Sequence, residues 1–448
     1  MNSPGPTDNA PEEPGTSPRN VRKVVAASLV GTTIEWYDYF AYGTAAALVF
    51  PKLFFPDFSP IAGTLASFAT FSVGFIARPV GGAAFGHFGD RIGRKTMLVV
   101  TLMLMGVATV LIGLLPTYAQ IGAVAPFLLV VLRFAQGVAV GGEWGGAVLM
   151  AVEHSPRKRR GFNGSWPQVG VPAGLLLSTG VFSVASSLPE QAFLSWGWRV
   201  PFLASAVLVL VGLLIRLQIM ESPVFLRMQQ ERSGGRIPLV DLFVTHWRGV
   251  LLCVGTRIGT DVSFYVHAVY SLSYVTTNLG LPKSVALNAT LIAAALEIVT
   301  IPVVGRLSDR FGRRPVMMVG AVLLAAWALP FFLLLETRSA LGVTLAIVVG
   351  LAVAQATVYA PMGTFYAELF APRVRYSGIS VGYQVAGVFG GGLAPIIATA
   401  LYAATNGYPA ISVYIALTAA LTLLCVWLGR ALLRHNLAHD EVATARSS

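Results

Sequence analysis

The sequence predicts an all-α membrane protein of twelve transmembrane helices in two six-helix halves, with both termini in the cytoplasm. Three observations predict this class. Of the 448 residues, 55% are hydrophobic and only 11% are charged, and the mean hydropathy is +0.70, whereas about a quarter of the residues of a soluble domain are charged. The apolar residues gather in runs of about 20, the length that crosses a bilayer as a helix. A charged loop motif occurs twice, separated by close to half the chain.

Apolar runs long enough to cross a bilayer divide six and six around the longest polar loop. We expect an N-terminal half at 21–220, a cytoplasmic linker at 221–248 and a C-terminal half at 249–434. Residues 1–20 are rich in Pro, Gly, Ser and acids, so we expect a disordered tail there, and 435–448 read as a short polar tail. The expected spans are 24–50, 61–86, 96–116, 124–150, 163–187, 199–219, 249–277, 286–305, 315–335, 341–366, 378–404 and 409–430.

The basic residues lie mainly on one side of the predicted membrane. The chain has 31 Lys and Arg against 20 Asp and Glu, a net charge of +11. Most of these basic residues fall in loops that an inside N-terminus would place in the cytoplasm, as the positive-inside rule requires. The distribution indicates a multi-pass plasma-membrane protein in contact with membrane lipid, and it argues against a nucleic-acid partner.

The two cysteines, Cys253 and Cys425, lie inside separate apolar runs. This arrangement supports neither a disulfide framework nor a metal site. The sequence also lacks a nucleophile elbow, an HExxH pair and a GxxxxGK[ST] loop. We therefore expect no metal, no cofactor and no enzymatic activity.

The repeated loop motif indicates a duplicated unit. GHFGDRIGRK at 86–95 returns as GRLSDRFGRR at 305–314, and EHSPRKR at 153–159 returns as ELFAPRVR at 368–375. Parallel halves of this size are typical of membrane transporters. Anchoring to lipid headgroups would not by itself require Asp and Gly at fixed spacing. The candidate motif residues are Gly86, Asp90, Arg91, Gly93, Arg94, Lys95, Asp309, Arg310, Arg313, Arg314, Glu368 and Arg373.

Two carboxylates lie near the middle of the first expected span. Glu35 and Asp38 are three residues apart, so they share one face of a helix. An ionised carboxylate is expensive at the centre of a bilayer, so both are expected to face a wet cavity or a partner and are functional candidates. The alternative is a buried structural pair, tied to a neighbouring arginine or to hydroxyl groups.

Further polar residues occur inside other expected spans. In the fourth span Arg133 lies one turn from Gln136, and an arginine at this depth needs a carboxylate, for which Glu35 and Asp38 are the nearest kind of candidate. Glycines beside this pair would let other helices approach closely.

In the C-terminal half, Arg257 and Asp261 are four residues apart on one helix. This spacing allows them to neutralise one another as a structural pair, or to serve a solute. Glu297 is isolated within the eighth span and is a candidate proton site.

These residues resemble a known family. The DRIGRK loop, the stretch RFAQGVAVGGE from Arg133 and the six-plus-six layout resemble the major facilitator superfamily. Within it, EWYDYF at 35–40, RPVGGAAFGHFGDRIGRK at 78–95, GGEWGGA at 141–147, SWGWRVPF at 195–202 and ELFAPRVRYSG at 368–378 resemble the metabolite:proton symporter family, which includes shikimate, α-ketoglutarate and proline/betaine permeases.

The resemblance implies transport of a small solute and a proton by alternating access. It implies that Asp90 and its neighbours form a gating motif with charge contacts, and that Arg133 takes part in proton coupling. Because Arg133 would lower and a dry cavity would raise the proton affinity of a nearby carboxylate, solute and proton binding can be coupled. We hypothesise that Glu35 or Asp38 takes the proton and that Arg133, alone or with Arg257, attracts the carboxylate of the solute.

Other functions are compatible with parts of the sequence. Proton-driven export of an apolar compound would use the same fold, but intramembrane carboxylates and arginines favour a polar solute. No motif in the sequence supports a membrane enzyme or a receptor-like scaffold. The fusion of both halves in one chain predicts a functional monomer.

Overall fold

The computed structural model describes most of the chain, and every regular element in the described part is a helix. The described residues are 18–92, 94–141, 144, 148, 151–152, 155–218, 246–370 and 375–430. Most of the expected N-terminal tail, nearly all of the linker and the C-terminal tail lie outside them.

The first part of the chain forms long helices joined by short ones. The long helices are α1 (Pro18–Leu48), α3 (Pro60–Ile92), α4 (Arg94–Leu114), α6 (Val124–Val140), α8 (Arg160–Ser186) and α10 (Val200–Gln218). Their connections contain α2 (Phe50–Leu53), α5 (Tyr118–Ile121), α9 (Glu190–Ser195) and the 3₁₀ turns Arg157–Arg159 and Gly197–Arg199. Helix α8 stays continuous through two internal prolines.

The second part contains three helices that include π-helical stretches, which often mark functional positions. Helix α13 (Trp247–Tyr265) continues through two π-helical turns, Val266–Tyr270 and Tyr274–Asn278, on either side of α14 (Ser271–Ser273). The π-helical stretch Val349–Gln355 joins α17 (Ala340–Val348) to α18 (Ala356–Leu369), and the stretch Val388–Gly392 joins α19 (Arg375–Gly387) to α20 (Ala394–Thr405). The remaining helices are α15 (Lys283–Phe311), α16 (Arg313–Leu335) and α21 (Pro409–Leu428).

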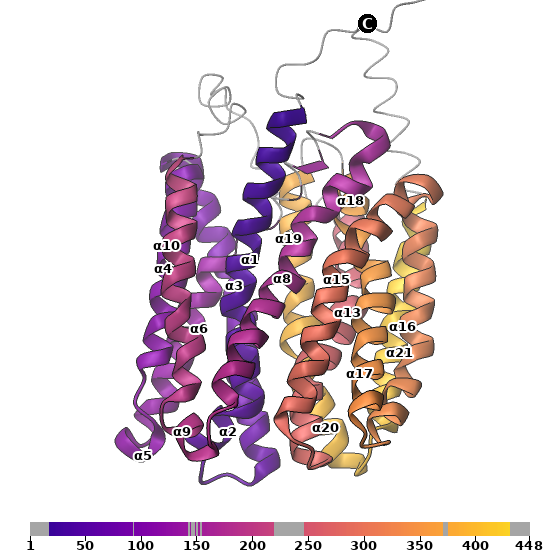
Figure 1. Ribbon diagram of the computed structural model, residues 1–448. Helices are drawn as coiled ribbons and strands as arrows, with labels where there is room; N and C mark the ends of the chain where they lie inside the picture. Colours follow the sequence, from indigo (N-terminus) through magenta and orange to yellow (C-terminus); the bar gives the residue numbers. More distant parts are fainter. Residues whose placement is uncertain are drawn as a thin grey trace, which may run out of the picture.

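The long helices run side by side in one bundle (Figure 1). Helices α4, α6 and α10 lie on one side and α16, α17 and α21 on the other, while α8 packs against both α1 and α15 between them. The end that holds α2, α5 and α9 is called the short-helix end below. The opposite end, with the turn at 157–159 and the junction of α15 and α16, is called the charged-loop end.

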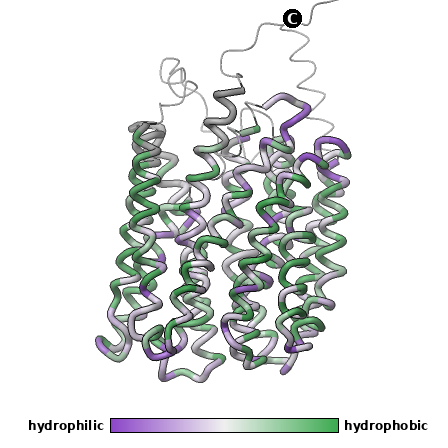
Figure 2. Tube along the Cα trace, in the orientation of Figure 1, coloured by the Kyte–Doolittle hydropathy of each residue, from purple (hydrophilic) through white to green (hydrophobic). Residues whose placement is uncertain are grey.

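The helices have the length and polarity of membrane spans. Large apolar side chains are exposed, as at Val184 and Leu341, which are 74% and 70% exposed. Hydrophobic residues predominate along most of the helices (Figure 2). In the described chain, two apolar helices are shorter, Val99–Leu114 and Val124–Val140, and eight are long and apolar enough to cross a membrane: Pro60–Gly82, Arg160–Ser186, Gly197–Leu214, Lys283–Phe311, Arg313–Leu335, Ala340–Leu369, Ser377–Thr405 and Pro409–Leu428.

These findings confirm an all-helical, multi-pass membrane protein. The first and seventh expected spans correspond to α1 and to the helix that begins with α13, and both carry charged residues in their middle. The count of twelve spans, the cytoplasmic termini and the limits of the two halves remain predictions.

Glycines set the distance between α3 and α6, as expected for the fourth span. A Cβ atom on Gly137 would meet the carbonyl oxygen of Gly74 and would lie 2.7 Å from the Ala77 Cβ atom. A Cβ atom on Gly74 would lie 2.6 Å from Nε of Arg133. The two backbones therefore touch, and this contact holds Arg133 inside the bundle.

We predict that Gly137→Ala lowers the thermal midpoint of the purified protein in detergent, because the added methyl group forces α3 and α6 apart. Overpacking of this kind costs about 1–3 kcal/mol. Gly180→Ala is the matched control, since a Cβ atom there would lie 3.8 Å from Leu291 Cδ2, an ordinary contact. Equal midpoints for the two variants would contradict the tight crossing.

Candidate functional site

Arg133 lies inside the bundle on α6 and is 1% exposed. Its Nε–H donates to the Phe71 carbonyl oxygen at 3.4 Å, and its Nη1 donates to Gln136 Oε1 at 3.1 Å. Its Cζ atom lies 4.3 Å from the ring centroid of Tyr39 and 4.1 Å from that of Tyr42. Its Nη2 atom has no hydrogen-bond partner among the described residues. The charge is therefore held by ring faces and neutral oxygens, and one donor stays open.

A chain of polar groups leads from Arg133 toward Asp38. The amide of Gln136 donates to Thr109 Oγ1 at 2.7 Å. Asp38 on α1 lies beside the hydroxyl groups of Thr109 and Ser205, within electrostatic range of Arg133. Asp38 is 1% exposed, and neither of its oxygens meets hydrogen-bond geometry with a described residue. The expected neighbourhood of Arg133 and Asp38 is present, but the two form no ion pair.

Two further candidate carboxylates, Glu35 and Glu297, lie on α1 and α15. Glu35 is buried one turn earlier on α1 and contributes to the electrostatic environment of Tyr383. Glu297 on α15 is fully buried, and both of its oxygens lack a hydrogen-bond partner among the described residues. Within that part of the chain, no hydrogen bond or ion pair links Glu297 to Arg133.

Arg257 and Asp261 form an ion pair on α13, with Nε and Oδ2 2.6 Å apart. The Arg257 guanidinium lies over Tyr383, 3.0 Å from the ring centroid, and this ring stacks on Trp144 at 3.6 Å. The structure thus realises the pairing that the four-residue spacing permits. It makes Arg257 a weaker candidate than Arg133 for an incoming carboxylate.

Arg78 on α3 belongs to the same interior, although it is not among the site residues that the sequence predicts. It is 1% exposed, and its Cζ atom lies 4.6 Å from the Tyr39 centroid, 4.8 Å from Phe75 and 5.5 Å from Trp36. Its Nε and Nη2 atoms have no hydrogen-bond partner. An arginine within an apolar run is energetically costly, and the reasoning that identified Arg133 on this ground applies equally to Arg78.

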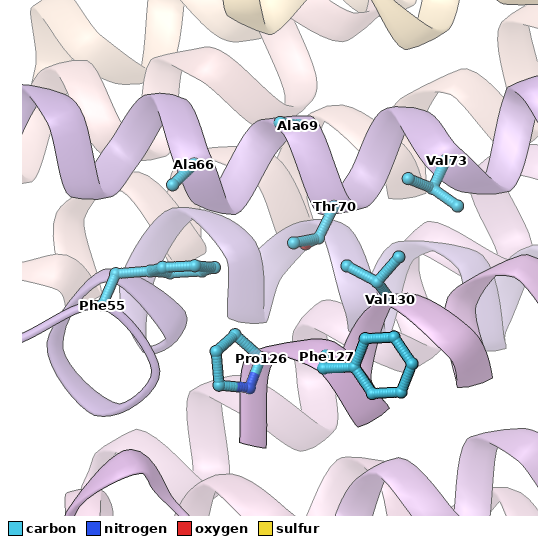
Figure 3. Close-up of a pocket in the computed structure, with 8 residues that line it drawn as sticks. All are labelled: Phe55, Ala66, Ala69, Thr70, Val73, Pro126, Phe127 and Val130. Carbon is cyan, nitrogen blue, oxygen red and sulfur yellow. The ribbon is translucent and has the colours of Figure 1, made fainter. Parts of the chain in front are cut away.

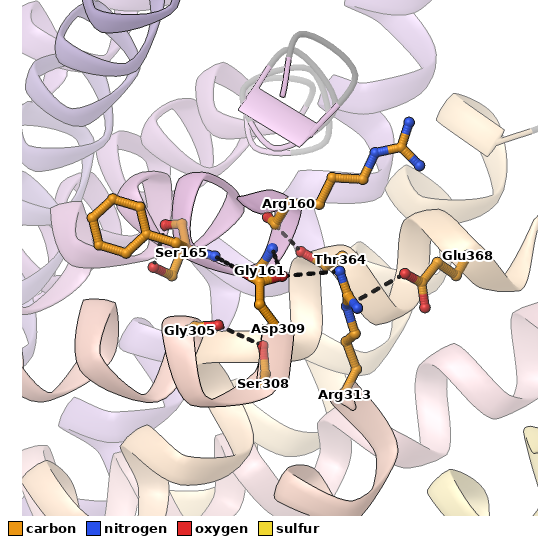
Figure 4. Close-up of polar contacts among 10 residues, drawn as sticks. Arg160, Gly161, Ser165, Gly305, Ser308, Asp309, Arg313, Thr364 and Glu368 are labelled. Carbon is orange, nitrogen blue, oxygen red and sulfur yellow. Dashed lines mark hydrogen bonds and ion pairs between the residues drawn. The ribbon is translucent and has the colours of Figure 1, made fainter. Parts of the chain in front are cut away.

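The second copy of the loop motif ties α15 to α8 at the charged-loop end (Figure 4). Asp309 accepts hydrogen bonds from the backbone N–H groups of Gly161 and Phe162, at 2.8 and 2.9 Å. These groups begin α8, so a carboxylate meets the positive end of a 27-residue helix. Arg313 Nη2 donates to the same carboxylate at 3.1 Å and pairs through Nε with Glu368 at 3.4 Å. These contacts form the charged-loop latch.

Arg314 and Arg310, from the second copy of the loop motif, do not belong to the charged-loop latch. Arg314 donates from Nε to the Val426 carbonyl oxygen at 2.9 Å, and Arg310 is exposed. In the first copy of the loop motif, the chain is helical on both sides of Gly93, which itself lies outside the described residues. The side chains of Asp90, Arg91, Arg94 and Lys95 also lie outside the described part of the chain, as does Arg373. Gly86 belongs to α3.

A second latch lies at the short-helix end and was not foreseen. Glu190 on α9 accepts a hydrogen bond from Lys52 Nζ at 2.9 Å and from Lys283 Nζ at 3.0 Å. These hydrogen bonds hold the pKa of the Glu190 carboxyl below its ordinary value of 4.5. Because Lys52 follows α1 and Lys283 begins α15, this short-helix latch joins early and late parts of the chain.

The bundle has an apolar groove on its outer surface, between α3 and α6 (Figure 3). Its volume is about 390 Å³, and it is lined by Phe55, Ala66, Ala69, Thr70, Val73, Pro126, Phe127 and Val130. The groove does not include Arg133, Asp38 or Arg78, which are buried inside the bundle. The polar interior, rather than the groove, is the candidate transport site.

An interior of this kind, in a bundle with latched ends, defines a membrane transporter rather than an enzyme, and comparison with known proteins gives the family. Residues 23–241 match the model of sugar (and other) transporters, and residues 256–441 match that of the major facilitator superfamily. The chain is 44% identical over 434 residues to the inner membrane metabolite transport protein YhjE of Escherichia coli K12, covering 95% of this chain and 97% of the relative. It is 45% identical over 394 residues to the shikimate transporter of the same organism, covering 87% and 90%. The chain belongs to the major facilitator superfamily, among its metabolite transporters.

Solved structures agree on the fold. The proton:xylose symporter XylE bound to 6-bromo-6-deoxy-D-glucose superposes with a TM-score of 0.73 at 17% identity, covering 92% of this chain and 96% of that one. A partially occluded inward-open form of XylE from E. coli gives 0.69 at 18%, covering 91% and 96%. The family models and the sequence relatives confirm the resemblance to the major facilitator superfamily, and those relatives are transporters, not enzymes.

We predict that Glu190→Gln loosens the short-helix end. Exposed ion pairs contribute about 0.2–1 kcal/mol each, so the open population should rise severalfold. A cysteine placed at the buried Ser273 should then react faster with a maleimide. Because the pKa of Glu190 is lowered, the latch is present above pH 4.5 and is lost as the pH falls through the lowered value. Asp57→Asn, at the same end, is the control, and equal labelling of both variants would refute the latch.

We predict that Asp309→Asn opens the charged-loop end, because the neutral amide loses the charge that faces α8 and Arg313. Hydrogen bonds to charged groups contribute about 1.5–3 kcal/mol, so a cysteine at the buried Val148 should be labelled roughly tenfold faster or more. Arg306→Gln, an exposed arginine on the same helix that is not among the candidate motif residues, is the control. Unchanged labelling in Asp309→Asn would show that the contact carries no gating free energy.

Proposed function

We propose that the chain carries a small carboxylate or zwitterionic metabolite across the plasma membrane together with a proton. The two halves, 21–220 and 249–434, move around the polar interior and expose it to each side in turn. Transport requires one monomer and no cofactor. The partners are the solute, the proton and membrane lipid.

One observation carries this proposal: a buried arginine with an open donor lies near a buried carboxylate that has no hydrogen-bond partner. An unpaired charge is costly in such surroundings. Arg133 therefore favours an anion, and Asp38 favours a proton. Hydrogen bonds of 3.1 and 2.7 Å lead from Arg133 through Gln136 to Thr109, which lies beside Asp38.

This arrangement couples solute to proton electrostatically. An ionised Asp38 competes with a solute carboxylate for the field of Arg133, and protonation removes the competitor. Proton binding therefore raises solute affinity, and solute binding raises proton affinity by the same factor. Coupling of this type is typically about 1–3 kcal/mol, or roughly 5- to 150-fold.

The relatives support the solute class. One relative is named a shikimate transporter, and another, 36% identical over 391 residues, is the proline/betaine transporter of E. coli K12. These names describe a carboxylic acid and zwitterions. Export of an apolar compound is not favoured, because the interior buries Arg78, Arg133 and Arg257, whereas a site for an apolar compound needs mostly apolar walls.

Uptake into proteoliposomes tests the proposal. Labelled shikimate, α-ketoglutarate and glycine betaine are offered with and without an inward proton gradient. Accumulation of one of them that depends on the gradient and stops with an uncoupler supports symport. Loss of a preloaded compound under the gradient, without accumulation of any of the three, would favour export.

We predict that Asp38→Asn abolishes gradient-driven accumulation but retains exchange of labelled for unlabelled solute, because the amide resembles a permanently protonated acid. Glu35→Gln tests the other acid of the first span. Asp57→Asn, on an exposed loop, should match the wild type. Full pH-driven uptake in both Asp38→Asn and Glu35→Gln would contradict the assignment of the proton site.

A further inference from the structure

We propose that Arg78 is the second arm of the solute site, so that a carboxylate is bound by Arg78 and Arg133 together over the Tyr39 ring, and that the solute is a net anion. The inference rests on the proposed transport function and narrows it. It assigns a binding role to a side chain on α3 and excludes net-neutral zwitterions as preferred solutes.

The two guanidinium groups face the same ring. The Cζ atom of Arg78 lies 4.6 Å from the Tyr39 centroid, and that of Arg133 lies 4.3 Å from it. Both side chains are 1% exposed, and neither makes an ion pair with a carboxylate of the described chain. Two like charges are therefore held close together and away from water. Such an arrangement is favourable only when an anion joins them.

The groups around this ring have unused hydrogen-bonding capacity. Within the described chain, the following groups lack a hydrogen-bond partner: Arg78 Nε and Nη2, Arg133 Nη2, and the hydroxyl groups of Tyr39 and Tyr265. The Tyr265 ring lies 6.4 Å from that of Tyr39 and 5.3 Å from that of Phe75, in the same cluster. Buried polar groups in folded proteins are nearly always satisfied. Guanidinium forks match a carboxylate, and tyrosine hydroxyls match further oxygens of a solute.

Asp261 and Asp38 do not supply the missing negative charge. Asp261 lies within electrostatic range of Arg78 and Tyr39, but its short hydrogen bond is with Arg257. Asp38 carries the coupling proton when the solute binds. A solute carboxylate therefore completes the balance, whereas the cation of a zwitterion would add to the excess positive charge.

Ring stacking alone is a weaker explanation for Arg78. The faces of Trp36, Tyr39 and Phe75 stabilise a cation, but they leave its two open N–H donors without acceptors. A purely structural arginine is normally bound to carbonyl oxygens, as Arg199 is to Gly113 and Leu115. The open donors of Arg78 thus indicate a ligand.

The test compares the affinities of an acid and its neutral ester. Shikimate and methyl shikimate compete with labelled shikimate for uptake by full-length protein, and the ratio of the two inhibition constants is measured. The ratio does not depend on how much protein is folded. If shikimate is not carried, α-ketoglutarate and its dimethyl ester serve the same comparison.

We expect Arg78→Gln to reduce the preference for the acid by about tenfold or more, as loss of one partner of a buried charge pair does. Arg78→Lys keeps the charge and loses the fork, so its preference should be intermediate. Arg133→Gln should resemble Arg78→Gln. Arg338→Gln removes an exposed arginine and should leave the ratio unchanged.

An unchanged ratio in both Arg78 variants overturns the inference. Gradient-driven uptake of glycine betaine in preference to both acids also overturns it, while leaving proton symport intact. Absence of gradient-driven uptake of all three probes by the wild-type protein would instead refute the proposed function. The two failures are therefore distinguishable.

Discussion

The structure depends on the burial of arginine in a bundle that is otherwise mostly apolar. A guanidinium group loses much of its hydration there, and only an anion, a carbonyl oxygen or an aromatic face can replace it. Arg257 has a carboxylate 2.6 Å away, whereas Arg133 has a backbone carbonyl, a side-chain amide and three aromatic rings. The difference separates a completed structural pair from a group that can still gain a ligand.

Close backbone contacts fix where these arginines lie. The glycines of α3 and α6 bring the two helices together at Arg133, and the π-helical stretch at 388–392 places its own glycines against Phe75. Ser72 donates a hydrogen bond to the carbonyl oxygen of Gly392 at the same crossing. Small residues therefore position the large charged ones, and movement at these crossings would alter the cluster directly.

The sequence predicted the features that depend on local chemistry. Hydropathy gave the membrane class, the four-residue spacing gave the Arg257–Asp261 pair, and an arginine in an apolar run gave Arg133. Arg78 was not predicted, because its position beside Tyr39 depends on how α1 and α3 pack against each other. The contact of Asp309 with the start of α8 and the lysine latch at Glu190 join residues at least 90 positions apart. Such contacts follow from tertiary packing and leave no periodic signal.

The two latches differ in strength, and this difference bears on the direction of transport. The Asp309 side chain is 9% exposed and receives two backbone hydrogen bonds as well as one from Arg313. Glu190 is 56% exposed and, among the described residues, forms ion pairs with Lys52 and Lys283, so water and salt weaken these pairs. The short-helix end should therefore open more readily. If that end faces outward, as the distribution of basic residues predicts, the protein rests ready to receive solute from outside, which is the bias that an importer needs.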